Sequence, residues 1–400
     1  MEPKIRLKGY SGEWKSKKFG DFGYVSMCKR IFKYQTSSKG EIPFYKIGSF
    51  GANPDSYITR NLYEEYRRKF SFPRKGDILI SAAGTVGRIV EYNGEDAYFQ
   101  DSNIVWLNHN SEIENKFLKY LYPIVKWSSL EGATIKRLYN SNILETSVVI
   151  PDIEEQKALS VFFANIDSMV SASASRLASL KQIKTASLQS MFPQEGESVP
   201  KVRFKGFDGE WKKVRLGDIT KGFMYGINAA AVPYDGSNKY LRITDIDDST
   251  HIFLQDSLTT PGANLSYCDE YIMQEGDIVV ARTGASVGKS YIYHESDGKV
   301  YFAGFLIRIR LEDIVNHDFV FQNTLSYQYS KYIKLVSMRS GQPGVNVDEL
   351  KSYKLCIPSF EEQQKIADYF TNLDKQISLQ SQRLEKLKQI KAACLDMMFV

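Results

Sequence analysis

Three short segments of the chain carry residue types that enzymes use for chemistry, and the first resembles a phosphate-binding loop. That loop requires four residues between two glycines, whereas three residues lie between Gly284 and Gly288, ahead of Lys289. A related segment has two residues between Gly84 and Gly87 and an arginine in place of the lysine. A geometry that cradles phosphates would not survive in both segments, so we expect no nucleotide site here.

The second segment imitates the carboxylate–lysine set of a nuclease, with Asp152, Glu155 and Lys157 close together. A similar segment near the end of the sequence replaces the aspartate by Ser359 and the lysine by Gln364. Both versions keep an N-cap residue and a glutamate three positions later, which is the capping box that begins many helices. A helix start therefore explains this segment better than catalysis does.

The third segment, Asn53-Pro54-Asp55, resembles the start of an amino-methyltransferase motif, which requires a second proline and an aromatic residue. The chain contains no pair of adjacent prolines. Its four histidines and four cysteines are scattered, without the spacing of a zinc site, a disulfide framework or a nucleophile with its base. We therefore expect a non-catalytic protein with no metal, no disulfide and no cofactor of its own.

The loops of the chain are instead rich in side chains that suit DNA. Arginine and lysine neutralise phosphates, arginine pairs with guanine, and asparagine or glutamine pairs with adenine. Such residues gather at 57–69, in the two glycine turns, and in the polar segments 132–137 and 339–346. A solvated helix face and plain hairpins are the alternative explanations. The predicted DNA-binding residues are Arg60, Arg67, Arg68, Lys69, Thr85, Arg88, Lys136, Arg137, Arg242, Arg282, Thr283, Lys289, Arg339, Gln342 and Asn346.

Charge is distributed unevenly along the chain. The net charge of +5 is too weakly basic to mark a nucleic-acid binder by itself. Residues 1–150 carry 23 Lys and Arg against 16 Asp and Glu, whereas residues 193–356 carry 19 against 21. If both regions bind a polyanion, the second must use a local patch of cations.

The elements that must position these loops occur twice. The segment from Pro3 to Trp14 returns as Pro200 to Trp211, and the segment from Ile150 to Phe192 returns as Ile357 to Phe399. A period this long indicates a duplicated domain with a duplicated connector. The sequence therefore divides into a first module (1–150), a spacer (151–192), a linker (193–199), a second module (200–356) and a second spacer (357–400).

Both spacers have the pattern of long amphipathic helices. Each begins with a capping box after a proline, and apolar residues then recur at three- and four-residue steps. The first spacer lacks proline and glycine from Asp152 to Met191, which predicts a helix of about 40 residues, or roughly 60 Å. So long an apolar stripe needs a partner of similar length, so we expect an intramolecular coiled coil rather than two independent helices.

Chain order makes this coiled coil antiparallel, because the first spacer leads into the second module and the last spacer leads out of it. That arrangement is expected to set the modules at opposite ends. The predicted seam includes Met169 and Ile390. Its core and partner contacts are expected at Leu159, Phe163, Ile166, Leu177, Leu180, Ile366, Phe370, Leu373, Leu384 and Leu387.

Within the modules the pattern is mixed. Residues 76–81 and 276–281 read as a turn followed by a buried strand, residues 105–107 and 305–310 read as strands, and helices are expected at 115–126 and 318–336. The predicted fold class is α+β, with two globular α/β domains separated by two long antiparallel helices. No apolar run approaches a bilayer span and Met1 begins no signal peptide, so we expect a cytoplasmic protein.

Two repeated motifs suggest a family. Each module opens with Gly-x-x-Gly-Glu-Trp, at Gly9 to Trp14 and Gly206 to Trp211, and each spacer opens with Ile-Pro-x-x-Glu-Glu-Gln, at Ile150 and Ile357. Over its whole length the chain resembles the specificity subunit of Type I restriction-modification enzymes. The most specific part of this resemblance is the duplicated helix, in which Phe163, Asn165 and Asp167 are matched by Phe370, Asn372 and Asp374.

The resemblance implies two target recognition domains, each reading one short half of a bipartite double-stranded DNA sequence, with the helices setting the unread gap. It also implies two methyltransferase subunits and restriction/translocase subunits as partners, which would hold the S-adenosylmethionine, ATP and magnesium. The alternatives are a stand-alone double-stranded DNA-binding protein without enzymatic partners and, more distantly, a protein–protein scaffold.

Overall fold

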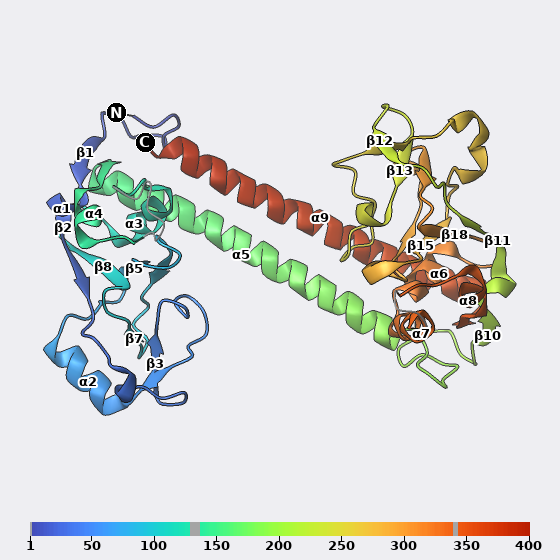
Figure 1. Cartoon of the computed structure of the whole chain (residues 1–400), viewed down its shortest axis with the longest axis horizontal. Coiled ribbons are helices and arrows are strands. Elements are labelled where there is room, and N and C mark those ends of the chain that lie inside the picture. The colour runs from blue at the N-terminus through green and yellow to red at the C-terminus, as the bar shows by residue number, and fades with distance from the viewer. Residues whose placement is uncertain (1, 129–136, 339–342) are drawn as a thin grey trace. The chain divides into compact units, whose positions relative to one another are not determined.

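The structure, a computed structural model, describes residues 2–128, 137–338 and 343–400. It divides into two compact units, Met1–Ala172 with Leu384–Val400 and Ser173–Arg383. Helix α5 (Ile153–Ser190) and helix α9 (Phe360–Met398) each pass from one unit into the other. The rest of each unit is a module of mixed helices and strands (Figure 1), so the fold class is α+β, as the sequence predicts.

The main sheet of the first unit has four strands in the order β2, β8, β5, β6, with every neighbouring pair antiparallel. A second sheet has the order β4, β3, β7, in which β3 and β7 run parallel, and β1 pairs with β9. The strands are β1 (Lys15–Lys18), β2 (Gly23–Met27), β3 (Ile42–Tyr45), β4 (Tyr57–Ile58), β5 (Ile78–Ser81), β6 (Ile89–Glu91), β7 (Tyr98–Phe99), β8 (Ile104–His109) and β9 (Ser147–Ile150). The helices are α1 (Phe19–Phe22), α2 (Arg60–Lys69), α3 (Asn115–Leu121) and α4 (Asn140–Glu145).

The second unit repeats this frame. Its main sheet has the order β11, β18, β15, β16, all antiparallel; β13 and β17 form the parallel pair, β12 pairs with β14, and β10 pairs with β19. The strands are β10 (Lys212–Arg215), β11 (Thr220–Tyr225), β12 (Ala231–Pro233), β13 (Lys239–Leu241), β14 (Thr259–Pro261), β15 (Ile278–Ala281), β16 (Ser290–Ile292), β17 (Val300–Phe302), β18 (Leu306–Leu311) and β19 (Lys354–Ile357). The helices are α6 (His317–Thr324), α7 (Tyr327–Ser337) and α8 (Val347–Ser352).

The expected strands are confirmed as β5, β15, β8 and β18, and both spacers are continuous helices of 38 and 39 residues. The helix expected at 318–336 is instead broken into α6 and α7. The break lies at Ser326, whose hydroxyl accepts from the backbone N–H of Tyr329 and so caps a new helix. The parallel strand pairs are features that the sequence pattern did not predict.

The largest hydrophobic cluster of each unit contains the end of one long helix and the start of the other. In the first unit the ring of Phe399 lies 5.4 Å from Phe117 and 5.7 Å from Phe163. In the second unit Phe192 lies 5.4 Å from Phe319 and 6.0 Å from Phe370. Because the sequence repeat relates these two sets of rings, the same aromatic contact fastens a helix end in both units.

Within each unit the two long helices run antiparallel. In the second unit Ser173 accepts a hydrogen bond from Gln380, and Ser187 shares one with Tyr369. A residue later in α5 therefore contacts a residue earlier in α9. Leu180, Leu373 and Ile377 are buried between these polar contacts. The coiled-coil pairing that the sequence predicts is therefore present.

The predicted seam differs from the observed contacts in its details. Met169 is 48% exposed and Ile390 is 43% exposed. Of the expected core contacts, Leu177, Leu384 and Leu387 are only partly buried. The fully buried positions are Leu159, Phe163, Ile166, Leu180, Ile366, Phe370 and Leu373.

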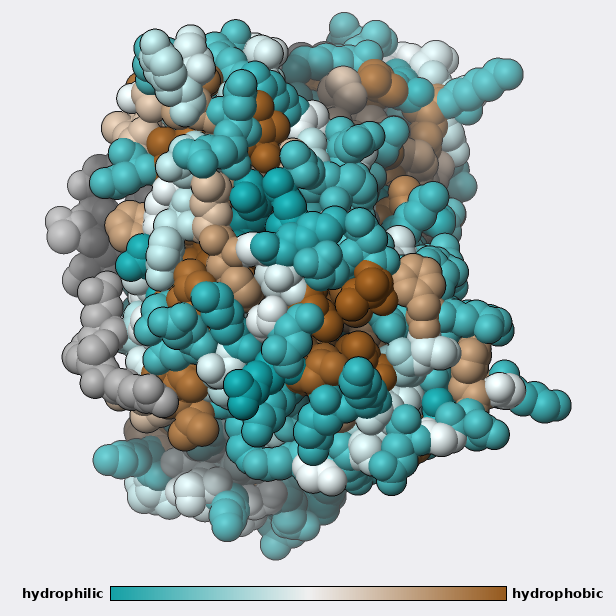
Figure 2. Space-filling view, turned by 90° about the vertical axis from the view of Figure 1, so that its right-hand side faces the viewer, coloured by the Kyte–Doolittle hydropathy of each residue, from teal (hydrophilic) through white to brown (hydrophobic). Residues whose placement is uncertain are grey.

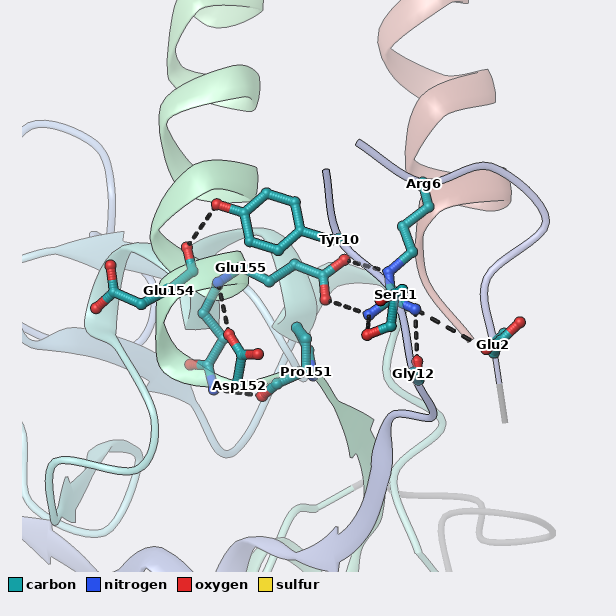
Figure 3. Close-up of polar contacts among 10 residues, drawn as sticks. Glu2, Arg6, Tyr10, Ser11, Gly12, Pro151, Asp152, Glu154 and Glu155 are labelled. Atoms are coloured by element: carbon teal, nitrogen blue, oxygen red, sulfur yellow. Dashed lines mark hydrogen bonds and ion pairs between the residues drawn. The ribbon is translucent and has the colours of Figure 1, made fainter. Parts of the chain in front are cut away.

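The opening segment of each module binds the start of the following long helix, and Figure 3 shows this contact in the first module. Arg6 donates from Nε and Nη2 to the two carboxylate oxygens of Glu155, at 2.8 and 2.7 Å. Arg203 does the same to Glu362, at 2.7 and 2.8 Å. Each glutamate side chain is 1% exposed, so the arginine supplies its counter-charge.

The capping boxes predicted at these helix starts are therefore used in a different way. The oxygen of Asp152 accepts from the backbone N–H of Glu155 at 2.9 Å, and that of Ser359 accepts from Glu362 at 3.4 Å. The two glutamate carboxylates are engaged by arginine instead of turning back to the cap. The glutamate thus joins the helix to its module.

Candidate nucleic-acid interface

Helix α2 carries the first group of predicted DNA-binding residues. It begins where the Thr59 hydroxyl accepts from the backbone N–H of Leu62, and its last turn contains Arg67, Arg68 and Lys69. Cations at this end are favoured by the helix dipole. Only Tyr63 of this helix is fully buried, so its cationic face is open to solvent.

The arginines of α2 are held by acidic and aromatic neighbours. Arg60 donates to Asp96 at 3.0 Å, and its hydrogen bond lowers the pKa of that carboxyl. Arg67 donates to the Tyr63 hydroxyl at 3.0 Å and lies 5.3 Å from the centre of the Phe72 ring. These contacts orient the guanidinium groups while leaving the residues exposed.

The glycine turn of the first module follows β5 directly. Gly84 and Gly87 have φ values of 64° and 83°, which residues other than glycine rarely adopt. The Ser81 hydroxyl accepts from the backbone N–H of Arg88 and ties the two sides of the turn together. Arg88 then donates to the carbonyl of Phe50 at 2.8 Å, while exposed Thr85 lies at the tip.

The residue directly after β5 in the first module, and the residue directly after β15 in the second, connect three loops in the same way. Ala82 donates its N–H to Asn103 and accepts at its carbonyl from Leu138, both at 2.8 Å. Arg282 donates to Phe305 at 2.9 Å and accepts from Val345 at 2.8 Å. The structure therefore brings the glycine turn and the segment before each long helix together.

One of the three loops joined by these hydrogen bonds was not predicted from the sequence. It is the turn before β8 in the first module, with Asn103, and the turn before β18 in the second, with Phe305. Arg137 also reaches this turn, because its Nη2 donates to the carbonyl of Ser102 at 3.3 Å. The signal that could have revealed these residues is their fixed position directly before a strand that both modules share.

Several predicted residues of the second module have partners within the protein. Lys289 donates to the carbonyl of Ile246 and to Asp248, and its side chain is 11% exposed. Arg242 binds both carboxylate oxygens of Asp245, at 2.8 and 2.7 Å. Lys289 and Arg242 therefore stabilise the loop at 242–248 through contacts within the protein.

Asn346 is likewise engaged, as the cap of α8. Its Oδ1 accepts from the backbone N–H of Glu349 at 2.9 Å, so the acceptor of a two-bond adenine contact is already occupied. Thr283 pairs with Gly344 across a β-bridge beside it. Lys136, Arg339 and Gln342 lie outside the described residues.

The described residues contain neither a cluster of metal-ligating side chains nor a helix that could span a membrane. Across 2–128, 137–338 and 343–400, no group of three or more His, Cys, Asp or Glu side chains could hold a metal ion. In that same part of the chain, no helix combines the length and apolar character that crossing a membrane requires. Figure 2 shows small hydrophobic patches between hydrophilic residues on the side of the second module where β10, β11 and α8 lie.

One known protein family matches the chain twice, once in each half of the duplication. The family described as "Type I restriction modification DNA specificity domain" matches residues 11–182 and again residues 208–389. Each match begins in a module and continues into the long helix that follows.

Known relatives are specificity subunits. A putative type I restriction enzyme specificity subunit of Haemophilus influenzae, S.HindORF215P, is 56% identical over 138 residues, which is 34% of this chain and 36% of the relative. The HindI specificity subunit of the same species is 27% identical over 48% of this chain and 41% of its own length. The chain thus matches less than half the length of these two relatives. The MjaVIII specificity subunit of Methanocaldococcus jannaschii is 20% identical over 81% of this chain and 75% of its own length.

Solved structures support the fold. The S subunit of a Type-I restriction-modification system from M. genitalium has a TM-score of 0.64 at 17% identity, covering 100% of this chain and 99% of that chain. A chain from a structure of a type I R-M system, solved for its complex assembly and conformational transition, has a TM-score of 0.54 at 15% identity, covering 98% of each.

Proposed function

The chain belongs to the family of Type I restriction modification DNA specificity domains, and from this membership we propose that it is the DNA sequence-specificity subunit of a Type I restriction-modification complex. Each module reads one short half of a bipartite double-stranded DNA target. The long helices set the number of unread base pairs between the halves. The observation that carries the proposal is the double match, in which each module is followed by its own long helix.

The physical advantage of this arrangement is effective concentration. Once one module is bound, a stiff connection holds the second module near its half-site. The two weak binding events then combine into one of higher affinity. Half-sites about one helical turn apart, roughly 34 Å, face the same side of the duplex. Helices of 38 and 39 residues, about 57 Å at about 1.5 Å per residue, are long enough to act as a ruler on this scale.

In this proposal the chain is non-catalytic and chemistry belongs to its partners. Two methyltransferase subunits dock on the helices and modules and hold S-adenosylmethionine, and restriction/translocase subunits bring ATP and magnesium. The names of the relatives support such an assembly. The scattered cysteines and histidines of this chain are consistent with a reader that performs no chemistry itself.

Pull-down of the tagged full chain from its host, together with sequencing of methylated DNA with and without the gene, tests the proposal. We expect a methyltransferase to co-purify, and methylation at one bipartite motif to vanish when the gene is deleted. Specific DNA binding without any enzymatic partner would instead indicate a stand-alone DNA-binding protein. A chain that binds no DNA with or without its partners would be a scaffold.

A further inference from the structure

A pocket of about 980 Å³ lies in the second module where three strands of the main sheet meet the loops. Tyr225 ends β11, Arg282 follows β15, and Phe305 precedes β18, and all three line the pocket. Their strands are neighbours in the sheet, so their positions are fixed by backbone pairing. The pocket is therefore built on a rigid frame.

Arg282 is fixed in its backbone and supported in its side chain. Its N–H donates to Phe305 and its carbonyl accepts from Val345, as described above. Its guanidinium carbon lies 4.7 Å from the centre of the Tyr225 ring, a cation–π contact. Among the residues that the structure describes, the guanidinium has no ion pair. Its planar donors thus remain available for a ligand with two adjacent acceptors.

Phe305 and Tyr225 expose large rings at the mouth of this pocket. Phe305 is 64% exposed and Tyr225 is 40% exposed. Hydrophobic side chains in such positions add little to the core, and an exposed ring beside a guanidinium that has no ion pair with any described residue is typical of a binding surface. The second module is acidic overall, so this local cation is the kind of patch that polyanion binding requires there.

The first module presents different chemistry at the same places. Tyr225 pairs with Ile307 of β18, and Met27 pairs with Val105 of β8. Since β18 and β8 correspond in the two sheets, Tyr225 corresponds to Met27. The shared bonding of Arg282 and Ala82 equates Phe305 with Asn103. An arginine with two aromatic rings in one module thus corresponds to alanine, methionine and asparagine in the other. Two modules with the same backbone arrangement and different side chains at these positions would recognise different half-sites.

We propose that this pocket is the base-reading site of the second module, with Arg282 bonded to O6 and N7 of a guanine and Phe305 in contact with the methyl group of a neighbouring thymine. Tyr225 is a positioning residue that holds the guanidinium. The inference rests on the proposed function and adds to it the bases that the second half-site contains.

The test uses DNA in which single acceptors are removed. The full chain, with the methyltransferase that co-purifies with it, is assayed for binding to its mapped target and to targets containing 7-deazaguanine or uracil in one half. Wild-type protein should lose about 5- to 10-fold in affinity with 7-deazaguanine, which lacks the N7 acceptor. It should lose about fourfold with uracil, which lacks the thymine methyl group.

The variants separate the two contacts. Arg282→Ala should bind the 7-deazaguanine target and the normal target equally, and Phe305→Ala should do the same for the uracil target. Arg282→Lys, which keeps the charge without the planar pair of donors, should behave like Arg282→Ala. Tyr267→Ala, which removes an 83% exposed ring of the same module outside the pocket, should keep wild-type responses.

Three results would overturn the inference: a second half-site without guanine, variants that respond to the modified bases as wild type does, or loss of discrimination in both halves together. Failure of the proposed function has a different signature, because wild-type protein would then show no bipartite specificity at all. Circular dichroism of each variant establishes that the fold is kept.

Discussion

Lys184 and Asp374 form an ion pair between the two long helices in the second unit, with 2.6 Å between Nζ and Oδ1. In the first unit the repeat-related residues Lys391 and Asp167 form the same pair at 2.5 Å, with the helices exchanged. A slip of either helix would separate these charges. The two pairs therefore specify the antiparallel register of the helices.

Each aspartate of these pairs also binds its module. Gln322 donates to Asp374 at 2.9 Å, and Tyr120 donates to Asp167 at 2.9 Å. The carboxylate thus connects one long helix to the other and to the module. Helix register and module orientation are consequently coupled within each unit.

Replacing Lys184 by methionine should destabilise the second unit. The lysine side chain is 11% exposed, and its loss leaves Asp374 with a hydrogen bond but no counter-charge. We expect the free energy of unfolding to fall by about 1–2 kcal/mol, measured from the urea midpoint. Lys388→Met, at an exposed pair with Glu385, is the control and should leave the midpoint unchanged. Exchange of the charges, with Lys184→Asp and Asp374→Lys together, should restore part of the loss; no recovery would argue against a register role.

Replacing Arg6 by alanine should cost more in the first unit than in the second. Glu155 would then be buried without its donors, a loss of about 1–3 kcal/mol in unfolding free energy. Hydrogen exchange should locate the damage at the start of α5, whereas Arg203→Ala should damage the start of α9. Adding Glu155→Gln to Arg6→Ala removes the buried charge and should recover stability. Equal damage to both helix starts from one variant would contradict the modular arrangement.

Acid should loosen the loop at 247–251 of the second module. Burial alone would raise the pKa of Asp247, but hydrogen bonds from Thr250 and Ser249 lower it to about 2. Because the folded pKa lies below the unfolded value of about 3.9, the stabilisation is present above pH 4 and lost as pH falls from about 4 towards 2. The protection factor of this loop, which is the exchange rate of an unstructured peptide divided by that of the loop at the same pH, should fall between pH 4 and pH 2 in wild type. In Asp247→Asn the protection factor should already be low at pH 4 and change little, whereas Asp256→Asn should behave as wild type.

The repeated frame could be predicted from the sequence because its signals are local and occur twice. Helix caps, the long apolar stripes and the buried strands β5 and β15 each depend on residues close together in the chain. The parallel pairing of β3 with β7 could not be predicted in this way. Its residues Phe44 and Tyr98 are far apart in sequence, and strands of four and two residues show no periodicity.

The candidate DNA contacts were harder to predict, because residue type does not reveal local partners. Arg282 and Lys289 lie in the same connection between β15 and β16, yet Lys289 donates to Asp248 whereas the guanidinium of Arg282 lies over the ring of Tyr225. Phe305 was not among the predicted DNA-binding residues, because a phenylalanine at the start of a strand pattern is usually part of the core. Only the structure shows that it is exposed beside a guanidinium.

Removing Arg68 should weaken DNA binding of every sequence alike. This exposed arginine lies on the cationic last turn of α2, where phosphate contacts are expected. Each lost phosphate contact should reduce the slope of log affinity against log salt concentration by about 0.9. Filter binding of Arg68→Ala at several salt concentrations measures this slope, with Lys116→Ala on α3 as the matched control. A change in sequence preference with an unchanged slope would mean that Arg68 reads a base instead.

Lengthening both long helices by one heptad should change the gap in the DNA target. Seven residues add about 10 Å and close to two full turns, so side-chain faces are nearly restored. Insertions after Ala172 and after Arg383, where each helix passes from one unit into the other, leave the helix ends and the modules intact. At about 3.4 Å per base pair, the unread gap should grow by about three base pairs while both half-sites keep their sequences.

Methylation mapping of the host that carries this double insertion reads the gap directly. An insertion in one helix alone is the control, because it shifts the Lys184–Asp374 and Lys391–Asp167 pairs out of register and should abolish methylation. A gap that stays constant in the double insertion, with methylation retained, would show that the helices do not set the spacing. Because register and length are changed separately, the experiment distinguishes a ruler from a mere connector.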